Sequence, residues 1–85
     1  MTEQETQSGE TIVVIGQGCW GKGPDLRSAR REWIRQGGTM GGGYEVVTLD
    51  SETEMLGVDP VWGQIHYKGN EPTSRAVEPT RKARR

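Results

Sequence analysis

The clearest structural signal lies in residues 11–36, TIVVIGQGCWGKGPDLRSARREWIRQ. The β-branched run from Thr11 to Ile15 predicts a strand with apolar side chains on both faces. A glycine-rich loop is expected from Gly16 to Gly23, and a helix from about Pro24 to Gln36. Proline suits the first helical position, and Asp25 in the first turn complements the helix dipole.

Two more strands are predicted downstream, at Tyr44 to Leu49 and at Val61 to Lys68, with an acidic connection from Asp50 to Pro60 between them. The fold class is therefore predicted to be α+β, a strand–helix–strand–strand domain. One helix packs on a three-stranded sheet through an apolar stripe. A right-handed crossover would make the first two strands parallel neighbours, and the last two would form an antiparallel hairpin. The stripe consists of Leu26, Ala29, Trp33 and Ile34.

The composition limits the chain to one small domain. It has 85 residues, of which 31% are hydrophobic and 27% are charged, and its net charge is -1. Almost all apolar residues fall between Thr11 and Lys68, so we expect the α+β domain to span residues 11–68. Residues 1–10 are expected to be a disordered acidic tail and residues 69–85 a disordered basic tail. Neither segment buries enough apolar surface to offset the entropy of ordering.

The glycine-rich segment has two readings as a phosphate site. Gly16 to Gly21 spells G-x-G-x-x-G, but a dinucleotide site would put Gly21, Gly23 and Pro24 into the first helical turns, where they are unfavourable. The same segment nearly spells a Walker A motif, but Gly23 stands where Ser or Thr should hold magnesium. A looser anion site made of Gly21, Lys22 and free amides stays open.

Residues Gly18 to Ala29 resemble a segment of HicB-type antitoxins and their relatives. In that segment a strand ends in Gly-Cys, a glycine follows four residues after the Cys, and a helix opens with Leu and Ala three apart. The family's Thr and paired Glu near the helix start are absent here, and the family has a hairpin before the segment where one strand is expected. The resemblance implies a non-catalytic module that binds a partner protein, sometimes with nucleic-acid regulation. The matching residues are Gly18, Cys19, Gly23, Leu26 and Ala29.

No constellation in the sequence supports catalysis or metal binding. Cys19 and His66 are the only thiol and imidazole, and no third group is placed to orient the ring. The acidic connection fails as a calcium loop, because Met55 and Val61 occupy the sixth and twelfth positions counted from Asp50. We therefore expect no cofactor, no metal and no enzymatic activity.

Binding residues are a stronger prediction. Arg27, Arg31 and Arg35 recur every fourth residue on one helix face, where they can pair with phosphates or with an acidic protein, or simply face solvent. Trp20, and Trp62 beside Gln64 and His66, are the possible aromatic platforms. The candidate binding residues are Trp20, Lys22, Arg27, Arg31, Arg35, Trp62, Gln64 and His66.

The predicted function is a small regulatory module that binds a protein, as inhibitors and antitoxins of phages and mobile elements do. The alternative is a nucleic-acid-binding protein that uses the arginine row and the basic C-terminal tail. Self-association is also expected, through the sheet face away from the helix, unless the Asp50 to Pro60 connection folds back over that face. No run of about eighteen apolar residues is present, so no membrane partner is expected. The polar first ten residues lack the pattern of a signal peptide, which favours the cytoplasm.

Overall fold

The computed structural model describes residues 9–78, which form one helix and six strands. The α+β class is confirmed, and so is the packing of one helix on a sheet. The strand count is larger than the three expected, because three short strands lie in segments predicted as loops or tail. The elements are β1 (Thr11–Gly16), β2 (Cys19–Gly23), α1 (Leu26–Arg35), β3 (Tyr44–Leu49), β4 (Glu54–Asp59), β5 (Gln64–Lys68) and β6 (Thr73–Val77).

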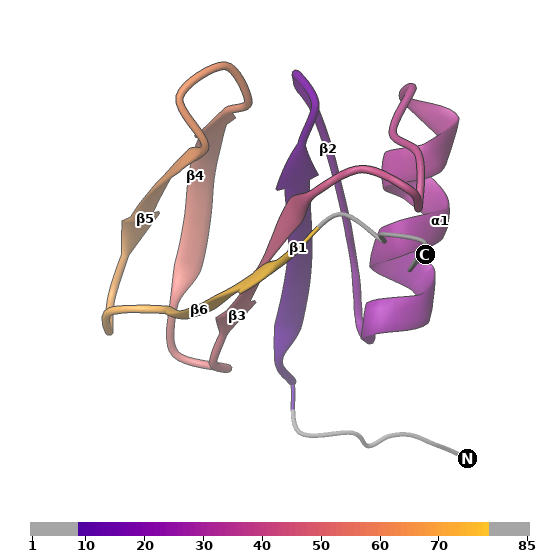
Figure 1. Ribbon diagram of the computed structural model, residues 1–85. Coiled ribbons are helices and arrows are strands. Elements are labelled where there is room, and N and C mark those ends of the chain that lie inside the picture. Colours follow the sequence, from indigo (N-terminus) through magenta and orange to yellow (C-terminus); the bar gives the residue numbers. More distant parts are fainter. Residues whose placement is uncertain (1–8, 79–85) are drawn as a thin grey trace, which may run out of the picture.

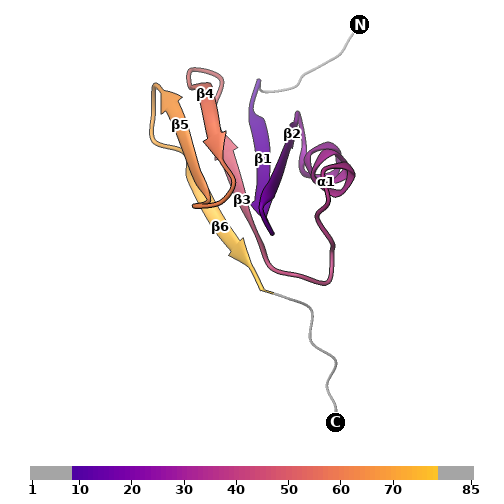
Figure 2. The same cartoon turned by 90° about the horizontal axis from the view of Figure 1, so that it is seen from above.

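The elements form three layers. The central sheet has the strand order β2-β1-β3-β6 and is antiparallel throughout. The helix α1 covers one face of this sheet, over β2 and β1, and the β4–β5 hairpin lies against the other face (Figures 1 and 2). Both faces of β1 are therefore buried, as its uninterrupted apolar run requires.

The glycine-rich segment is a hairpin rather than a loop. Gln17 and Gly18 have φ values of 57° and 79°, which is the geometry of a two-residue turn of type I′. The chain reverses there, so β2 pairs with β1, with Val14 opposite Gly21. The predicted parallel crossover is consequently wrong: β1 and β3 are antiparallel, because β2 returns the chain before the helix begins.

Glycine within β2 is explained by the helix above it. A Cβ atom on Gly21 would collide with the backbone nitrogen of Trp33, and one on Gly23 would lie 2.6 Å from the Cβ of Ser28. Only a strand that lacks side chains at these points lets α1 approach so closely. Glycine is a weak strand former because it has no side chain, and the same lack of a side chain makes room for the helix here.

The helix begins at Leu26, two residues later than the predicted start at Pro24. Asp25 is its N-cap rather than a first-turn residue, and its carboxylate accepts a hydrogen bond from the Ser28 N–H at 2.8 Å. This bond lowers the pKa of Asp25 below its ordinary value. The predicted stop at Gly37 is confirmed by its φ of 123°, just beyond the last helical turn.

The helix-side core is centred on Trp33, which is completely buried. Its indole nitrogen donates a hydrogen bond to the carbonyl of Gly16 at 3.0 Å, and its ring centroid lies 4.7 Å from that of Tyr44. The N–H of the indole therefore has a partner at the end of β1, and the ring fills the space between the helix and the sheet. The buried members of this cluster are Val14, Ala29, Trp33 and Val46.

A second core lies between the sheet and the β4–β5 hairpin. Its buried members are Val13, Ile15, Val47 and Leu49, and Met55, Val58 and Ile65 pack on them from the hairpin. The predicted self-association through this sheet face is therefore wrong, because the connection folds back and covers it. Ile65 of β5 thus packs on the sheet face opposite the helix.

The C-terminal part of the described chain also departs from prediction. A tail was expected from Gly69, but residues 73–77 form β6, which pairs with β3 and puts Arg75 opposite Val46. Backbone pairing holds this strand, with Val77 as its one side chain packed on the helix-side core. Such a strand carries no apolar alternation to signal it. The remaining tail predictions concern residues 1–8 and 79–85, which lie outside the described residues.

The acidic connection is organised by Asp50, which serves as a structural acceptor. Its carboxylate accepts hydrogen bonds from the Thr53 hydroxyl at 2.7 Å, the Glu52 N–H at 3.0 Å and the Asn70 side-chain amide at 2.9 Å. Asp50 thus ties the β3–β4 turn to the segment that leads into β6. The hydrogen bonds from Thr53 and Asn70 lower the pKa of Asp50 below 3.8.

Acid stability provides a test of this arrangement. Because folding lowers the pKa of Asp50, its contribution is complete above the ordinary value of 3.8 and is lost as pH falls through the folded value. We expect Asp50→Asn to flatten part of the fall in melting temperature below that pH. The control is Glu54→Gln, whose carboxylate makes no hydrogen bond or ion pair with the described residues. If the melting temperatures of Asp50→Asn and of the unmodified protein fell equally with pH, the stabilising role of the Asp50 carboxylate would be contradicted.

Candidate functional site

The outer edge of β2 is an open strand edge, because β2 is the terminal strand of the central sheet. Gly16 and Cys19 flank the two-residue turn and form a hydrogen-bonded pair. By the alternation of an antiparallel ladder, Gly21 then bonds to β1, while Trp20 and Lys22 direct their N–H and C=O groups away from the sheet. No backbone group within residues 9–78 bonds to this edge.

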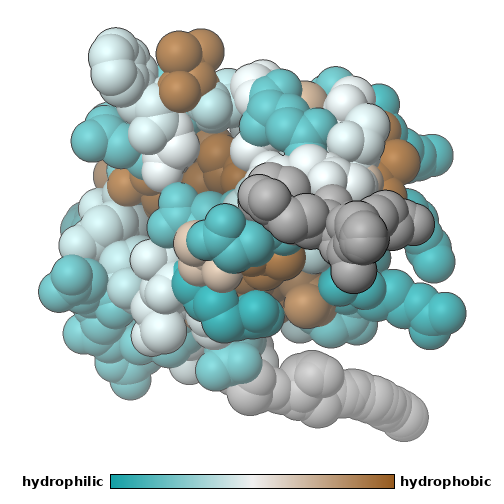
Figure 3. Space-filling view, in the orientation of Figure 1, coloured by the Kyte–Doolittle hydropathy of each residue, from teal (hydrophilic) through white to brown (hydrophobic). Residues whose placement is uncertain are grey.

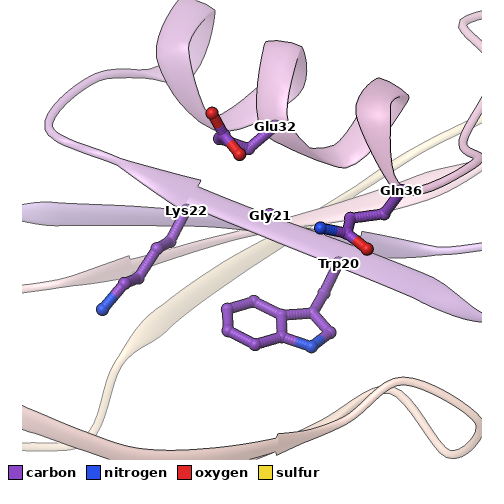
Figure 4. Close-up of a pocket in the computed structure, with 5 residues that line it drawn as sticks. All are labelled: Trp20, Gly21, Lys22, Glu32 and Gln36. Atoms are coloured by element: carbon purple, nitrogen blue, oxygen red, sulfur yellow. The ribbon is translucent and has the colours of Figure 1, made fainter.

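A hollow of about 520 Å³ runs along this edge, and we call it the edge groove. Figure 4 shows that Glu32 and Gln36 of α1 lie on one side of the strand, and the side chains of Trp20 and Lys22 on the other. Trp20 is half-buried against the hairpin-side core, so its ring is fixed, whereas Lys22 is exposed. The groove is lined by Trp20, Gly21, Lys22, Glu32 and Gln36.

The glycine-rich segment does not have the strand–loop–helix geometry of either phosphate motif, because β2 lies between the turn and the helix, and Gly21 does not supply a free amide to an anion site. The N–H of Gly21 takes part in the β1–β2 ladder, so it cannot cradle a phosphate. The helix starts only after Asp25, whose own carboxylate already binds the amide of Ser28. A glycine-rich segment makes an anion site when it opens directly into a helix N-terminus, and here a strand intervenes.

The exposed side of α1 is strongly basic. Arg27, Arg31 and Arg35 lie on it as predicted from their spacing, and Arg30 joins them. The one ion pair among residues 9–78 joins Arg35 to Glu32 at 3.2 Å. The other three arginines form no ion pair there, although Arg27 and Arg31 attract the Asp25 carboxylate at longer range. Two apolar residues accompany them and together they line a hollow of about 420 Å³, the arginine face. It consists of Arg27, Arg30, Arg31, Ile34, Arg35 and Met40.

The turn between β4 and β5 presents two large apolar side chains, and we call Val61 and Trp62 the hairpin tip. Each is 78% exposed, more than any other large hydrophobic residue in the described chain. The carboxylate of Asp59 accepts hydrogen bonds from both of their N–H groups, at 3.2 and 3.3 Å. The turn is closed by a bond from the Gly63 N–H to the Asp59 carbonyl at 2.8 Å. Figure 3 shows apolar colour protruding at this end of the hairpin.

The structure brings together only some of the predicted binding residues. Trp20 and Lys22 share the edge groove, and the three arginines share one helix face. Trp62 lies in the turn and not in β5, whereas Gln64 and His66 are exposed on that strand. Sequence reasoning missed the roles of four residues: Glu32 and Gln36 in the groove, and Ile34 and Met40 on the arginine face.

Cys19 and His66 lie in different layers of the fold. Cys19 packs with the helix-side core and donates a hydrogen bond from its thiol to the carbonyl of Gln17 at 3.4 Å. His66 is exposed on β5, in the hairpin layer. The two side chains therefore do not form a nucleophile–base pair, which requires direct contact.

Comparisons of the chain with family models, with curated proteins and with solved structures found no match. Within residues 9–78, no cluster of three or more His, Cys, Asp or Glu side chains is placed to hold a metal ion. The single helix of that region is too short and too polar to cross a membrane. Three surfaces of the described chain are therefore the candidate sites: the edge groove, the arginine face and the hairpin tip.

Proposed function

We propose that the protein is a small non-catalytic regulatory module, of the inhibitor or antitoxin kind, that binds a protein partner along the open edge of β2. The observation that carries this proposal is the pair of outward N–H and C=O groups on Trp20 and on Lys22, set in a hollow of about 520 Å³. An extended peptide adds to such an edge by main-chain hydrogen bonds, and the side chains beside the edge select its sequence. A nucleic acid cannot add to the edge in this way, because its sugar-phosphate backbone lacks the N–H and C=O groups of a β-strand.

The walls of the edge groove define the partner segment. Side chains on one face of an added strand would meet the indole of Trp20 and the ammonium of Lys22, which suits alternating apolar and acidic residues. Side chains on the other face would meet Glu32 and Gln36 above the bare Gly21, which suits small or hydrogen-bonding residues. The expected partner segment is thus an extended, amphipathic and mildly acidic strand.

The resemblance to HicB-type antitoxins supports the same role, because modules of that family bind a partner protein. The resembling segment runs from the turn residue Gly18 through β2 and into α1. Gly18 therefore lies in the turn and Cys19 begins a strand in this chain, where the resemblance led us to expect that a strand ends. The segment that carries the resemblance includes the whole of the exposed edge.

A proline at position 22 tests the role of the edge. Lys22→Pro removes an N–H that points away from β1, so the central sheet keeps its ladder while an added strand loses a bond. Lys22→Ala removes the same side chain and keeps the N–H, which makes it the matched control. We expect one partner from nuclease-treated host lysate to be retained by the unmodified protein and by Lys22→Ala, and to be lost by Lys22→Pro. Equal retention by both variants, with unchanged melting temperatures, would refute edge binding.

Nucleic acid binding is the second candidate, and the arginine face favours it. Four arginines share that surface, and Arg35 is the one that forms an ion pair with a described residue, Glu32 of the edge groove. If phosphates are the target, the logarithm of affinity for a random-sequence duplex falls steeply with the logarithm of salt concentration. The protein-binding proposal predicts a shallow dependence for the lysate partner and no saturable binding of the duplex at physiological salt.

A further inference from the structure

The hairpin tip and the arginine face lie in opposite outer layers of the molecule, and their shapes and charges are complementary. The tip projects from the β4–β5 layer, whereas the arginine face lies on α1, on the far side of the central sheet (Figure 1). One is a protrusion with an aromatic ring, and the other is a shallow hollow with an apolar floor. Because the central sheet separates them, the tip of one molecule cannot reach its own arginine face.

The hairpin tip has the features of a binding anchor. Trp62 is exposed on a turn whose backbone is already held by Asp59, so little conformational freedom would be lost when the ring is buried. Its surroundings are acidic: besides Asp59, the carboxylate of Glu45 lies within 3.9 Å of the position that a Cβ on Gly63 would take. A partner for this tip should be apolar at its centre and basic at its rim.

The arginine face meets both requirements. Ile34 and Met40 are 45% and 43% exposed and form the apolar floor. Arg27, Arg30 and Arg31 on the rim form no ion pair with the described residues, and only Asp25 attracts Arg27 and Arg31 at longer range. The hollow has a volume of about 420 Å³ and is open to solvent, so an indole ring can lie on its apolar floor without entering an enclosed cavity. Guanidinium groups around an indole add cation–π attraction.

We propose that the occupant of the arginine face is the hairpin tip of a second copy of this chain. Trp62 of one molecule inserts between the arginines of the next, with Asp59 and Glu45 facing the basic rim. A contact between two different surfaces is heterologous, and it propagates into open chains unless the geometry closes a ring. This assembly leaves the edge groove free, so it does not depend on the proposed function.

The mass of the full-length protein as a function of concentration tests the proposal. An interface made by one turn and one hollow is small, so we expect its dissociation constant to lie between about 10 μM and about 1 mM. In sedimentation equilibrium over that range we expect the average mass to rise beyond that of a dimer without a plateau. A monomer at every concentration, or a plateau at the dimer mass, would overturn the heterologous contact.

Two variants and their mixture identify the surfaces. Trp62→Ala removes the tip and keeps the hollow, whereas Ile34→Glu spoils the hollow and keeps the tip. Each variant alone should associate at least about tenfold more weakly than the unmodified protein. Mixed in equal amounts they should form a 1:1 heterodimer and nothing larger, since only one intact tip and one intact hollow remain per pair. Failure of the mixture to associate, or unchanged association of either variant, would overturn the proposal.

Two further variants serve as controls. Leu56 of β4 is also exposed, at 61%, but belongs to neither surface. Leu56→Ala should therefore associate as the unmodified protein does. Lys22→Pro should also leave self-association unchanged, which separates a failure of this proposal from a failure of edge binding. Loss of association in either control would show that a different surface carries the contact.

Discussion

Trp33→Ala is expected to unfold the domain. Trp33 is fully buried, packs beside Tyr44 and donates a hydrogen bond to the Gly16 carbonyl at 3.0 Å. Truncating a buried tryptophan typically costs about 3–5 kcal/mol, which is comparable to the whole stability of a small domain, about 5 kcal/mol. We expect far-ultraviolet circular dichroism at 25 °C to show that the native signal is lost.

The matched control is Trp62→Ala, which removes the same side chain from an exposed turn. It should melt within a few degrees of the unmodified protein. If Trp33→Ala also melted within a few degrees of the unmodified protein, the described packing of α1 on the central sheet would be contradicted.

Gly21→Ala is expected to have the second largest effect. The added methyl group would collide with the backbone nitrogen of Trp33 and lie 2.8 Å from the Ala29 carbonyl oxygen. These are backbone atoms of the helix, so α1 must move away from β2. Overpacking of this kind costs roughly 1–3 kcal/mol, to be measured as the free energy of unfolding in urea.

Gly41→Ala provides the comparison, because a Cβ atom there meets nothing within 4 Å and its φ is not positive. This substitution should be neutral or slightly stabilising, since it reduces the freedom of the unfolded chain. Equal free energies of unfolding for the two alanine variants would mean that the helix does not rest on Gly21.

The elements that sequence reasoning found are those whose side chains form the cores. The apolar runs of β1 and β3 and the apolar period of α1 follow from burial, which is a property of the residues themselves. The missed strands have other causes: β2 carries glycines that the helix requires, β4 lies in an acidic segment interrupted by Gly57, and β6 is held by its pairing with β3. Pairing with a distant strand leaves no mark in the local sequence.

The candidate site could be predicted only in part for a related reason. The arginine row follows from helical spacing, so Arg27, Arg31 and Arg35 lie together as expected. Ile34 was assigned to the buried stripe and is instead the floor of the arginine face, because α1 sits over β2 and β1 and leaves that residue uncovered. Whether a strand edge is open depends on the order of the strands in the sheet, and the residues of the strand itself do not indicate that order.

The central claim, that β2 binds an extended segment of a partner, is tested most directly by amide hydrogen exchange at Trp20, Gly21 and Lys22. The probe is a linear peptide selected from a random library on the unmodified protein and against Lys22→Pro. In the free protein, the amides of Trp20 and Lys22 should exchange fast and that of Gly21 slowly, because only Gly21 bonds to β1. In the peptide complex, Trp20 and Lys22 should slow by at least about tenfold. Peptide binding that leaves these two amides exchanging at their free rates would contradict the account.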